Sequence, residues 1–493
     1  MKRSSGILMP LFSLPSPYGI GTLGKAAYDF IDFLKAAGQK YWQLLPLCPT
    51  DHGDSPYSSP STFAGNPYFI DLDILAEEGL LDGEELKKID WGGDEEKVDY
   101  RKMYENRLPV LRKAFEKGRE AYAQELQSFY DANRRWLENY ALYMALKKEF
   151  GNRPWYEWPE DIRRREAQAV ERYSCELKEE TRFWVFVQFM FYRQWDRLKA
   201  YAAENGISFI GDVPIYVAMD SADVWSEPWF FMMDENFVPT EVSGVPPDYF
   251  NEDGQLWGNP LYDYAKMKAD GYGWWIRRIE GAARLYDAVR IDHFRGFESF
   301  WAVPYGEKTA RSGVWRKGPG IELVRILTSW FNQLEFIAED LGINTPEVAE
   351  MLRESKLPGM KVLEFAFDSK SESSYLPHNC QSHSCCYIGT HDNNTVLGWL
   401  EEQSAEDLEF AADYMHITEE EGWCRGMIRT GMATGSNLFV MQMQDILELP
   451  GSCRTNMPGV AEGNWRWRMK KGAADSKTAA ELLKITETYR RKY

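Results

Sequence analysis

Eight short apolar segments, each followed by a polar or glycine-containing stretch, constrain the fold of this chain more than any other feature. Short continuous apolar runs are typical of strands buried on both faces of a parallel sheet. Helical patterns at residues 25–37, 274–285, 321–334 and 345–353 separate several of them. Strands that alternate with helices in this way predict an α/β fold, the (β/α)8 or TIM barrel. The predicted strands are Ile7–Phe12, Tyr41–Leu47, Ser208–Asp212, Ala288–Asp292, Phe336–Glu339, Lys361–Phe367, Cys386–Gly389 and Asn437–Met443.

Two connections are much longer than a crossover between parallel strands requires. Residues 48–207, after the second strand, contain long charged helical patterns, so we expect an inserted, mostly helical subdomain. Residues 213–273, after the third strand, are rich in Trp, Pro, Asp and Gly with little periodicity, and long loops without regular structure are usually functional. The connection between the sixth and seventh strands is too short for a full helix. We expect one catalytic barrel over residues 1–493 with a helical insertion and an aromatic-rich active-site loop region.

The charge balance argues against a polyanionic partner. The chain carries 57 basic and 76 acidic side chains, a formal charge of −19, and its Lys and Arg residues are not clustered. Nucleic acid or an anionic membrane requires a concentrated basic surface. We therefore expect no nucleic-acid and no membrane partner. The 19 Trp, 27 Tyr and 26 Phe residues exceed what a core needs, and their faces suit stacking on sugar rings.

The cysteines and the N-terminus indicate a reducing, cytoplasmic location. Seven sparsely spread cysteines do not resemble a secreted disulfide framework. The first residues contain Pro10 and Pro15, which interrupt any signal-peptide-like apolar run. The sequence contains no run of about 18 apolar residues, the length that a membrane-spanning helix needs.

Three carboxylates lie at or just after the carboxyl ends of predicted strands, where a barrel carries its catalytic groups. They are Asp292, Glu339 and Asp392. Arg290 faces the same way as Asp292, because strand side chains alternate, and a neighbouring arginine keeps a carboxylate ionised. A glutamate near two aspartates has its pKa raised by like charge, which suits a general acid. The alternative interpretation is that these residues are solvated carboxylates at strand ends or helix caps. The occurrence of three of them at strand ends of one barrel favours a catalytic role.

Paired carboxylates with many aromatics and no thiol or metal motif favour glycosyl transfer or hydrolysis. Two further patterns compete with this reading. Gly19, Gly21 and Gly24 spell a dinucleotide fingerprint, but no acid ends the second strand as that fingerprint requires. The segment 378–386 holds two His and three Cys residues, yet its Cys385 and Cys386 should point to opposite sides of a strand. We therefore expect no metal and no cofactor.

Several longer motifs resemble those of the amylomaltases, the 4-α-glucanotransferases of glycoside hydrolase family 77. The resemblance runs in order along nearly the whole chain. It rests on Asp-Val-Pro-Ile-Tyr-Val (212–217), Val-Arg-Ile-Asp-His-Phe-Arg-Gly (289–296), Ile-Ala-Glu-Asp-Leu-Gly (337–342) and Gly-Thr-His-Asp-Asn-Asn-Thr (389–395). Ser-Pro-Tyr-Ser (55–58), Gly-Val-Pro-Pro-Asp-Tyr-Phe (244–250), Leu-Trp-Gly-Asn-Pro (256–260) and Gly-Asn-Trp-Arg-Trp-Arg (463–468) extend it.

The resemblance implies a role for each matching residue. Asp292 would be the nucleophile, Glu339 the acid/base and Asp392 the stabiliser of the distorted sugar. Arg290, His293, His391 and Asp212 would surround the donor sugar, and Tyr57, Asp368, Trp257 and Asn464 are further candidate glucan contacts. The family lacks the C-terminal β-sandwich of the α-amylases, and we expect none here.

The implied activity is transfer of α-1,4-glucan segments between maltooligosaccharides through a covalent intermediate. Two rivals stay open at this point: an α-1,4-glucan hydrolase with the same three carboxylates, and a non-catalytic barrel that only binds glucans. Two interpretations stay open for the aromatic residues of the second insertion: they cover the site and exclude water, or they pack against one another and hold this segment over the barrel. These residues are Trp225, Trp229, Phe230, Tyr249, Phe250 and Trp257.

Overall fold

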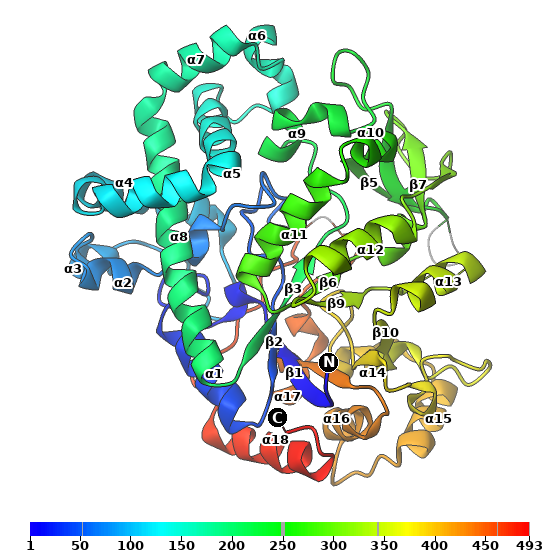
Figure 1. Cartoon of the computed structure of the whole chain (residues 1–493). Helices are drawn as coiled ribbons and strands as arrows, with labels where there is room; N and C mark the ends of the chain where they lie inside the picture. Colours follow the sequence, from blue (N-terminus) through cyan, green and yellow to red (C-terminus); the bar gives the residue numbers. More distant parts are fainter. Residues whose placement is uncertain (52, 248–251, 343–344, 461, 493) are drawn as a thin grey trace.

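The computed structural model describes residues 1–51, 53–247, 252–342, 345–460 and 462–492. Eight parallel strands form one sheet in the order β10-β11-β12-β1-β2-β3-β6-β9 (Figure 1). The two ends of this sheet meet, since the Ala338 N–H in β9 donates to the Pro358 carbonyl at 3.0 Å, just before β10. The predicted barrel and its eight strands are confirmed. The strands are β1 (Ser4–Leu8), β2 (Tyr41–Gln43), β3 (Ser208–Val213), β6 (Ala288–Ile291), β9 (Glu335–Ala338), β10 (Gly359–Val362), β11 (Ser384–Tyr387) and β12 (Leu438–Gln442).

Alternation along the strands separates an inner from an outer core. Cys385 and Tyr387 of β11 belong to a cluster inside the barrel, whereas Cys386 packs in the larger cluster under the outer helices. The two neighbouring cysteines therefore face opposite sides, as the strand pattern predicted. The inner cluster is filled with side chains, which is typical of an eight-stranded barrel. It comprises Leu8, Tyr41, Ile210, Ala288, Ile337, Met360, Val362, Cys385, Tyr387, Leu438 and Val440.

Helices cover the outside of the barrel. Their start signals are visible in the sequence, as at α13, where Thr345 caps the helix and Pro346 occupies its first turn. Between β10 and β11 the chain forms only short 3-10 turns, which confirms that this connection has no full helix. The outer helices are α1 (Lys25–Ala36), α11 (Gly273–Leu285), α12 (Ile321–Trp330), α13 (Pro346–Ser355), α14 (Val396–Glu402), α15 (Ala405–Met415), α16 (Trp423–Ala433), α17 (Met443–Ile446) and α18 (Ser476–Thr488).

The chain between β2 and β3 forms the helical layer at the upper left of Figure 1. Its long helix α8 is held to the preceding loop by side-chain amides: Gln188 exchanges hydrogen bonds with the backbone of Gly65, and Gln194 does so with Asp71. Both glutamines are buried, so their pairing satisfies groups that would otherwise be costly to bury. The helices are α2 (Leu72–Glu77), α3 (Gly83–Leu86), α4 (Tyr100–Ala121), α5 (Ala123–Glu149), α6 (Glu160–Arg163), α7 (Ala167–Glu176) and α8 (Lys178–Glu204).

A second, antiparallel sheet lies beside the barrel in the order β5-β4-β7-β8 (Figure 1). Its strands are β4 (Glu241–Val245), β5 (Gln255–Pro260), β7 (Ser299–Pro304) and β8 (Val314–Lys317). The expectation that residues 213–273 lack regular structure is therefore wrong, since α9 (Ala222–Ser226) and α10 (Tyr264–Ala269) also lie there. The sheet was missed because β4 pairs with β7, a strand from beyond β6, and such long-range pairing leaves no local periodicity.

In the part of the chain that the structure describes, no helix has the length and apolar character needed to cross a bilayer. After β12 the described residues contain α17 and α18 and no further strand.

Candidate active site

The carboxyl ends of β6 and β9 place two of the predicted carboxylates next to each other. The strands are parallel neighbours with Ile291 opposite Ala338, so Asp292 and Glu339 follow at the same level. The Glu339 N–H donates to the Ile291 carbonyl at 3.0 Å. The His293 N–H donates to Glu339 Oε2 at 2.7 Å. Glu339 thus lies against the backbone that carries Asp292.

Arg290 links Asp292 to a second, fully buried carboxylate. Its Nη2 lies 2.9 Å from Asp292 Oδ1, and its Nη1 pairs with Asp212 Oδ2. The side chain of Asp212 is 0% exposed and that of Arg290 4%, whereas that of Asp292 is 28% exposed. A buried guanidinium is tolerated here because two carboxylates neutralise it. Asp292 therefore combines an ionic partner with access from outside the barrel.

Glu339 titrates close to neutral pH because it is buried. It is only 8% exposed, and its Oε1 accepts a 2.7 Å hydrogen bond from the Leu341 N–H. Burial raises the pKa of Glu339 to about 7; the charge of Asp292 acts in the same direction, and Arg290 and the two backbone N–H groups oppose it. A carboxyl with this pKa can both donate and accept a proton at neutral pH.

Asp392, in the loop after β11, has the opposite electrostatic environment. Its Oδ1 accepts a 2.6 Å hydrogen bond from Asn456 Nδ2, and its Oδ2 lies 3.3 Å from His391 Nε2. Burial favours the neutral acid, but the charge of His391 and the hydrogen bonds from His391 and Asn456 hold the pKa of Asp392 well below its usual range. Asn456 was not predicted, because it reaches Asp392 from a loop distant in sequence and carries no local signal. Asp392 is therefore ionised at neutral pH.

Tyr57 connects the two sides of the site. Its hydroxyl donates to Asp212 Oδ2 at 2.6 Å, and its ring stacks on the His391 imidazole with centroids 5.1 Å apart. Because Asp212 pairs with Arg290, tyrosine and arginine converge on one buried carboxylate. A continuous series of contacts therefore joins Asp392 to Asp292; its intermediate members are His391, Tyr57, Asp212 and Arg290. The next residue along the chain, His293, joins Glu339 to this series through its backbone N–H.

His293 connects the site with the second sheet through a contact with Trp257 of β5. Its backbone adopts a φ of 52°, in the left-handed region, a conformation that non-glycine residues adopt mainly where surrounding contacts enforce it. Here the N–H bond to Glu339 is one such contact. The imidazole meets the Trp257 ring edge to face at 4.9 Å, and burial lowers its pKa to about 4. Trp257, on β5, is 38% exposed, so an aromatic face remains available beside a neutral imidazole.

Two predicted glucan contacts are not joined to this network by any contact of the described residues. Asp368 is exposed and closes its own turn, accepting hydrogen bonds from the Lys370 N–H and the Ser371 hydroxyl. Asn464 closes the loop before it through the backbone of Met457 and Val460. The residue after Asn464 does reach the site: the Trp465 ring lies 5.8 Å from Tyr57 and 6.0 Å from His391.

The aromatic cover also differs from the expectation. Trp225 and Phe230 are buried and pack within the protein, and Trp229 lines a separate pocket described below. Tyr249 and Phe250 lie outside the described residues. Of the six aromatic residues expected over the site, Trp257 is the one that contacts a site residue among those described. The structure differs from the prediction because residue type does not show which aromatic side chains fill the core.

The glycines of the first competing pattern have a structural role. A side chain at Gly21 would place its Cβ 1.9 Å from the Leu11 carbonyl oxygen, and one at Gly24 would come within 1.9 Å of the Asp71 carboxylate. These glycines allow close packing inside the protein. Among the described residues no group of three or more His, Cys, Asp or Glu side chains is arranged to hold a metal ion.

A parallel barrel with two carboxyl groups at adjacent strand ends, and a third, ionised carboxylate in the same network, has the arrangement used by glycan-processing barrel enzymes. Comparison with known proteins narrows this class. Residues 9–474 match the model of glycoside hydrolase family 77, described as 4-alpha-glucanotransferase. The chain belongs to this family.

Individual relatives agree with this assignment. The 4-alpha-glucanotransferase of Clostridium butyricum is 45% identical over 98% of this chain and 100% of its own length. The 4-alpha-glucanotransferase of Thermus thermophilus is 45% identical over 100% of this chain and 99% of its own length. The amylomaltase of Streptococcus agalactiae, solved in complex with acarbose, is 41% identical and superimposes with a TM-score of 0.97 over the full length of both chains. Corynebacterium glutamicum amylomaltase, at 20% identity and a TM-score of 0.76, shares the fold over 99% of this chain and 74% of its own.

Proposed function

We propose that this chain is a 4-α-glucanotransferase in which Asp292 is the nucleophile and Glu339 the acid/base. The observation that carries the assignment is the pairing of an ionic, accessible Asp292 with a Glu339 whose pKa is about 7 at the ends of adjacent strands. A carboxyl group that can donate a proton, next to a second carboxylate that can attack the sugar, is the pair that glycosyl transfer uses.

The reaction then proceeds in two steps, formation of a covalent intermediate on Asp292 and its transfer to an acceptor. The Asp292 carboxylate attacks the anomeric carbon of an α-1,4-linked glucose while Glu339 gives its proton to the departing 4-oxygen, which leaves as the hydroxyl end of one glucan segment. The other segment remains attached to Asp292 as a β-linked ester. The ionised Glu339 then removes the proton from the 4-hydroxyl of an acceptor, whose oxygen attacks the same carbon and releases Asp292. An α-1,4 link is broken and an α-1,4 link is made.

The remaining polar groups fit the donor sugar. Asp392 stays ionised and stabilises the positive charge of the oxocarbenium-like transition state. Four side chains that hold one another in place surround the donor sugar: Arg290, Asp212, His391 and Tyr57. They position the reacting carbon, and the site does not need to reorganise during the reaction. We also assign sugar contacts to His293 and Trp257 and, further along the glucan, to Asp368 and Asn464.

Products formed from maltotriose test this function. We expect glucose together with maltodextrins longer than maltotriose, because release of glucose leaves a maltosyl unit on the enzyme and a sugar hydroxyl rather than water receives it. Chromatography of a time course with maltotriose as the single substrate provides the measurement. Maltose and glucose without longer products would assign the chain to the hydrolases instead, and unchanged maltotriose would assign it to the glucan-binding barrels.

The pKa of Glu339 predicts the alkaline limb of the pH profile. Glu339 must be protonated to cleave the glycosidic bond, so activity is present below its pKa and is lost as pH rises through about 7. We expect kcat/KM for maltotriose to fall by about tenfold per pH unit above that point. In Glu339→Gln the residual activity should lose this limb, since an amide does not titrate. A wild-type profile that stays flat to pH 9 would contradict the role.

A further inference from the structure

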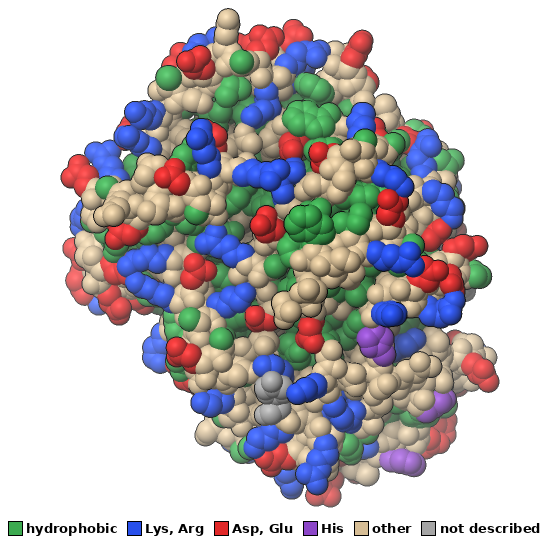
Figure 2. All heavy atoms as spheres, viewed as in Figure 1, with side chains coloured by type: hydrophobic (Ala, Val, Ile, Leu, Met, Phe, Trp, Pro, Cys, Tyr) green, Lys and Arg blue, Asp and Glu red, His purple; other side chains and the backbone are tan. Residues whose placement is uncertain are grey.

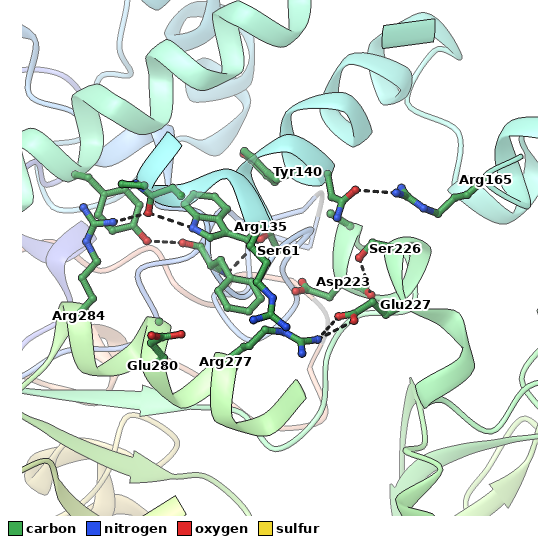
Figure 3. Close-up of a pocket in the computed structure, with 18 of the residues that line it drawn as sticks. Ser61, Arg135, Tyr140, Arg165, Asp223, Ser226, Glu227, Arg277, Glu280 and Arg284 are labelled. Atoms are coloured by element: carbon green, nitrogen blue, oxygen red, sulfur yellow. Dashed lines mark hydrogen bonds and ion pairs between the residues drawn. The ribbon is translucent and has the colours of Figure 1, made fainter. Parts of the chain in front are cut away.

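A pocket of about 630 Å³ lies away from the three carboxylates, between the helical insertion and the barrel (Figure 3). One wall is α5 of the insertion, with Trp136 and Asn139; the opposite wall is α11 of the barrel, with Arg277 and Arg284. The segment 222–229 closes one end. None of Asp292, Glu339 and Asp392 lines it, so it is distinct from the site described above.

The pocket presents aromatic faces. Trp229 is 53% exposed, which leaves its indole accessible for stacking on a ligand. The rings of Phe63 and Trp136 are stacked, 17° from parallel with centroids 6.2 Å apart, and both line the pocket. Flat aromatic surfaces in a concave site bind the apolar C–H face of a sugar ring.

Several of its polar groups are fixed by contacts with one another (Figure 3). Arg277 binds both oxygens of Glu227, at 2.7 and 2.6 Å. Arg284 donates to Asn133 Oδ1 at 2.7 Å and lies over the Tyr192 ring. Such pre-positioned donors and acceptors lose little rotamer entropy when a ligand binds.

The charges of the lining nearly cancel, which favours a neutral ligand over a multiply charged anion. Four arginines, at positions 135, 165, 277 and 284, face three acidic residues, Asp223, Glu227 and Glu280, so the ionised lining carries a net charge of +1. Figure 2 shows basic, acidic and hydrophobic side chains interspersed over this face of the molecule rather than gathered into a patch of one sign. Alternating donors and acceptors beside aromatic faces match a chain of hydroxyl-bearing sugar rings better than an anion.

One segment connects this pocket with the catalytic site. Tyr57 binds Asp212 at the catalytic end, and a few residues later Phe63 lines the pocket. Between them, the backbone N–H and hydroxyl of Thr62 bind the Asp223 carboxylate at 2.9 and 3.0 Å, and Asp223 itself lines the pocket. Residues 57–63 thus fix the position of the pocket relative to the catalytic residues.

We propose that the α5–α11 pocket is a second glucan-binding site, which holds a segment of a long α-glucan away from the catalytic carboxylates. The choice of ligand rests on the proposed function. A polymer bound at two places on one chain reaches the catalytic site at a higher effective concentration than a free short donor. The pocket therefore discriminates between long and short substrates.

Binding without turnover is the direct test. In the full-length Asp292→Asn chain, titration calorimetry with maltoheptaose should give two equivalents per chain. Adding Trp229→Ala should leave one, and the control Trp330→Ala should leave two, since Trp330 is 67% exposed at the end of α12 and does not line the pocket. A single equivalent that Trp229→Ala does not affect would overturn the proposal, as would inorganic phosphate competing for the second equivalent. Arg135→Ala, also exposed, provides an independent pocket variant.

Kinetics of otherwise wild-type chains give a second readout. Trp229→Ala should lower kcat/KM for amylose by about fivefold and leave maltotriose kinetics unchanged. An equal loss on both substrates would place Trp229 in the catalytic cleft and refute a second site. The proposed function fails on a different observation, the absence of maltotriose conversion by the wild-type enzyme, which the calorimetric result does not depend on.

Discussion

Replacing Asp292 by alanine should lower the rate of maltotriose disproportionation by about 10⁴-fold or more, because no other group can form the covalent intermediate. The fold should survive. The Arg290 guanidinium keeps Asp212 as its buried partner after Asp292 is removed, so no uncompensated charge is left in the interior. The Asp292 side chain is also partly exposed, so truncation does not open a core cavity. Initial rates together with thermal unfolding of both proteins provide the measurement.

Asp292→Asn is the matched variant, since it keeps the size of the side chain and removes its nucleophilic oxygen anion. We expect the same loss of rate as in Asp292→Ala. Substantial activity in either variant, or a loss of activity that coincides with loss of folded protein, would show that Asp292 does not have the assigned role.

The Arg290→Met variant should be strongly destabilised as well as inactive. Asp212 would remain fully buried with its cationic partner gone, and removal of one member of a buried ion pair costs about 3–5 kcal/mol. Tyr57 can donate only one hydrogen bond to that carboxylate. The free energy of unfolding, measured in urea, should fall by about this amount if unfolding is two-state.

A surface pair supplies the control for Arg290→Met. Arg353 is 75% exposed and pairs with Glu350 within one helix, so Arg353→Met should change the free energy of unfolding by less than about 0.5 kcal/mol. In the double variant Arg290→Met with Asp212→Leu, stability should recover in part, because the unpaired charge is gone. If the single Arg290 variant is as stable as the wild type, the buried ion pair does not support the site as described.

The sequence identifies the barrel and the chemistry but not the surroundings of the catalytic groups. The eight barrel strands can be recognised from the local sequence, because a strand buried on both faces needs a continuous apolar run. Asp292, Glu339 and Asp392 are recognisable as the polar residues that follow three of those runs. Trp225 and Trp229 show the limit: they lie four residues apart in one segment, yet one is buried beneath Arg165 and the other is exposed in a pocket.

The amino-acid sequence by itself determined which segments form the eight barrel strands, the alternation that places Arg290 beside Asp292, and the family to which the motifs point. Only the tertiary structure decided that the pKa of Glu339 is raised to about 7 while that of Asp392 is lowered, that Asn456 binds Asp392, and that β4 finds a partner, β7, beyond β6. The physical reason is distance along the chain. Strand formation and side-chain alternation depend on neighbouring residues, whereas burial, charge environment and sheet pairing depend on groups that only folding brings together.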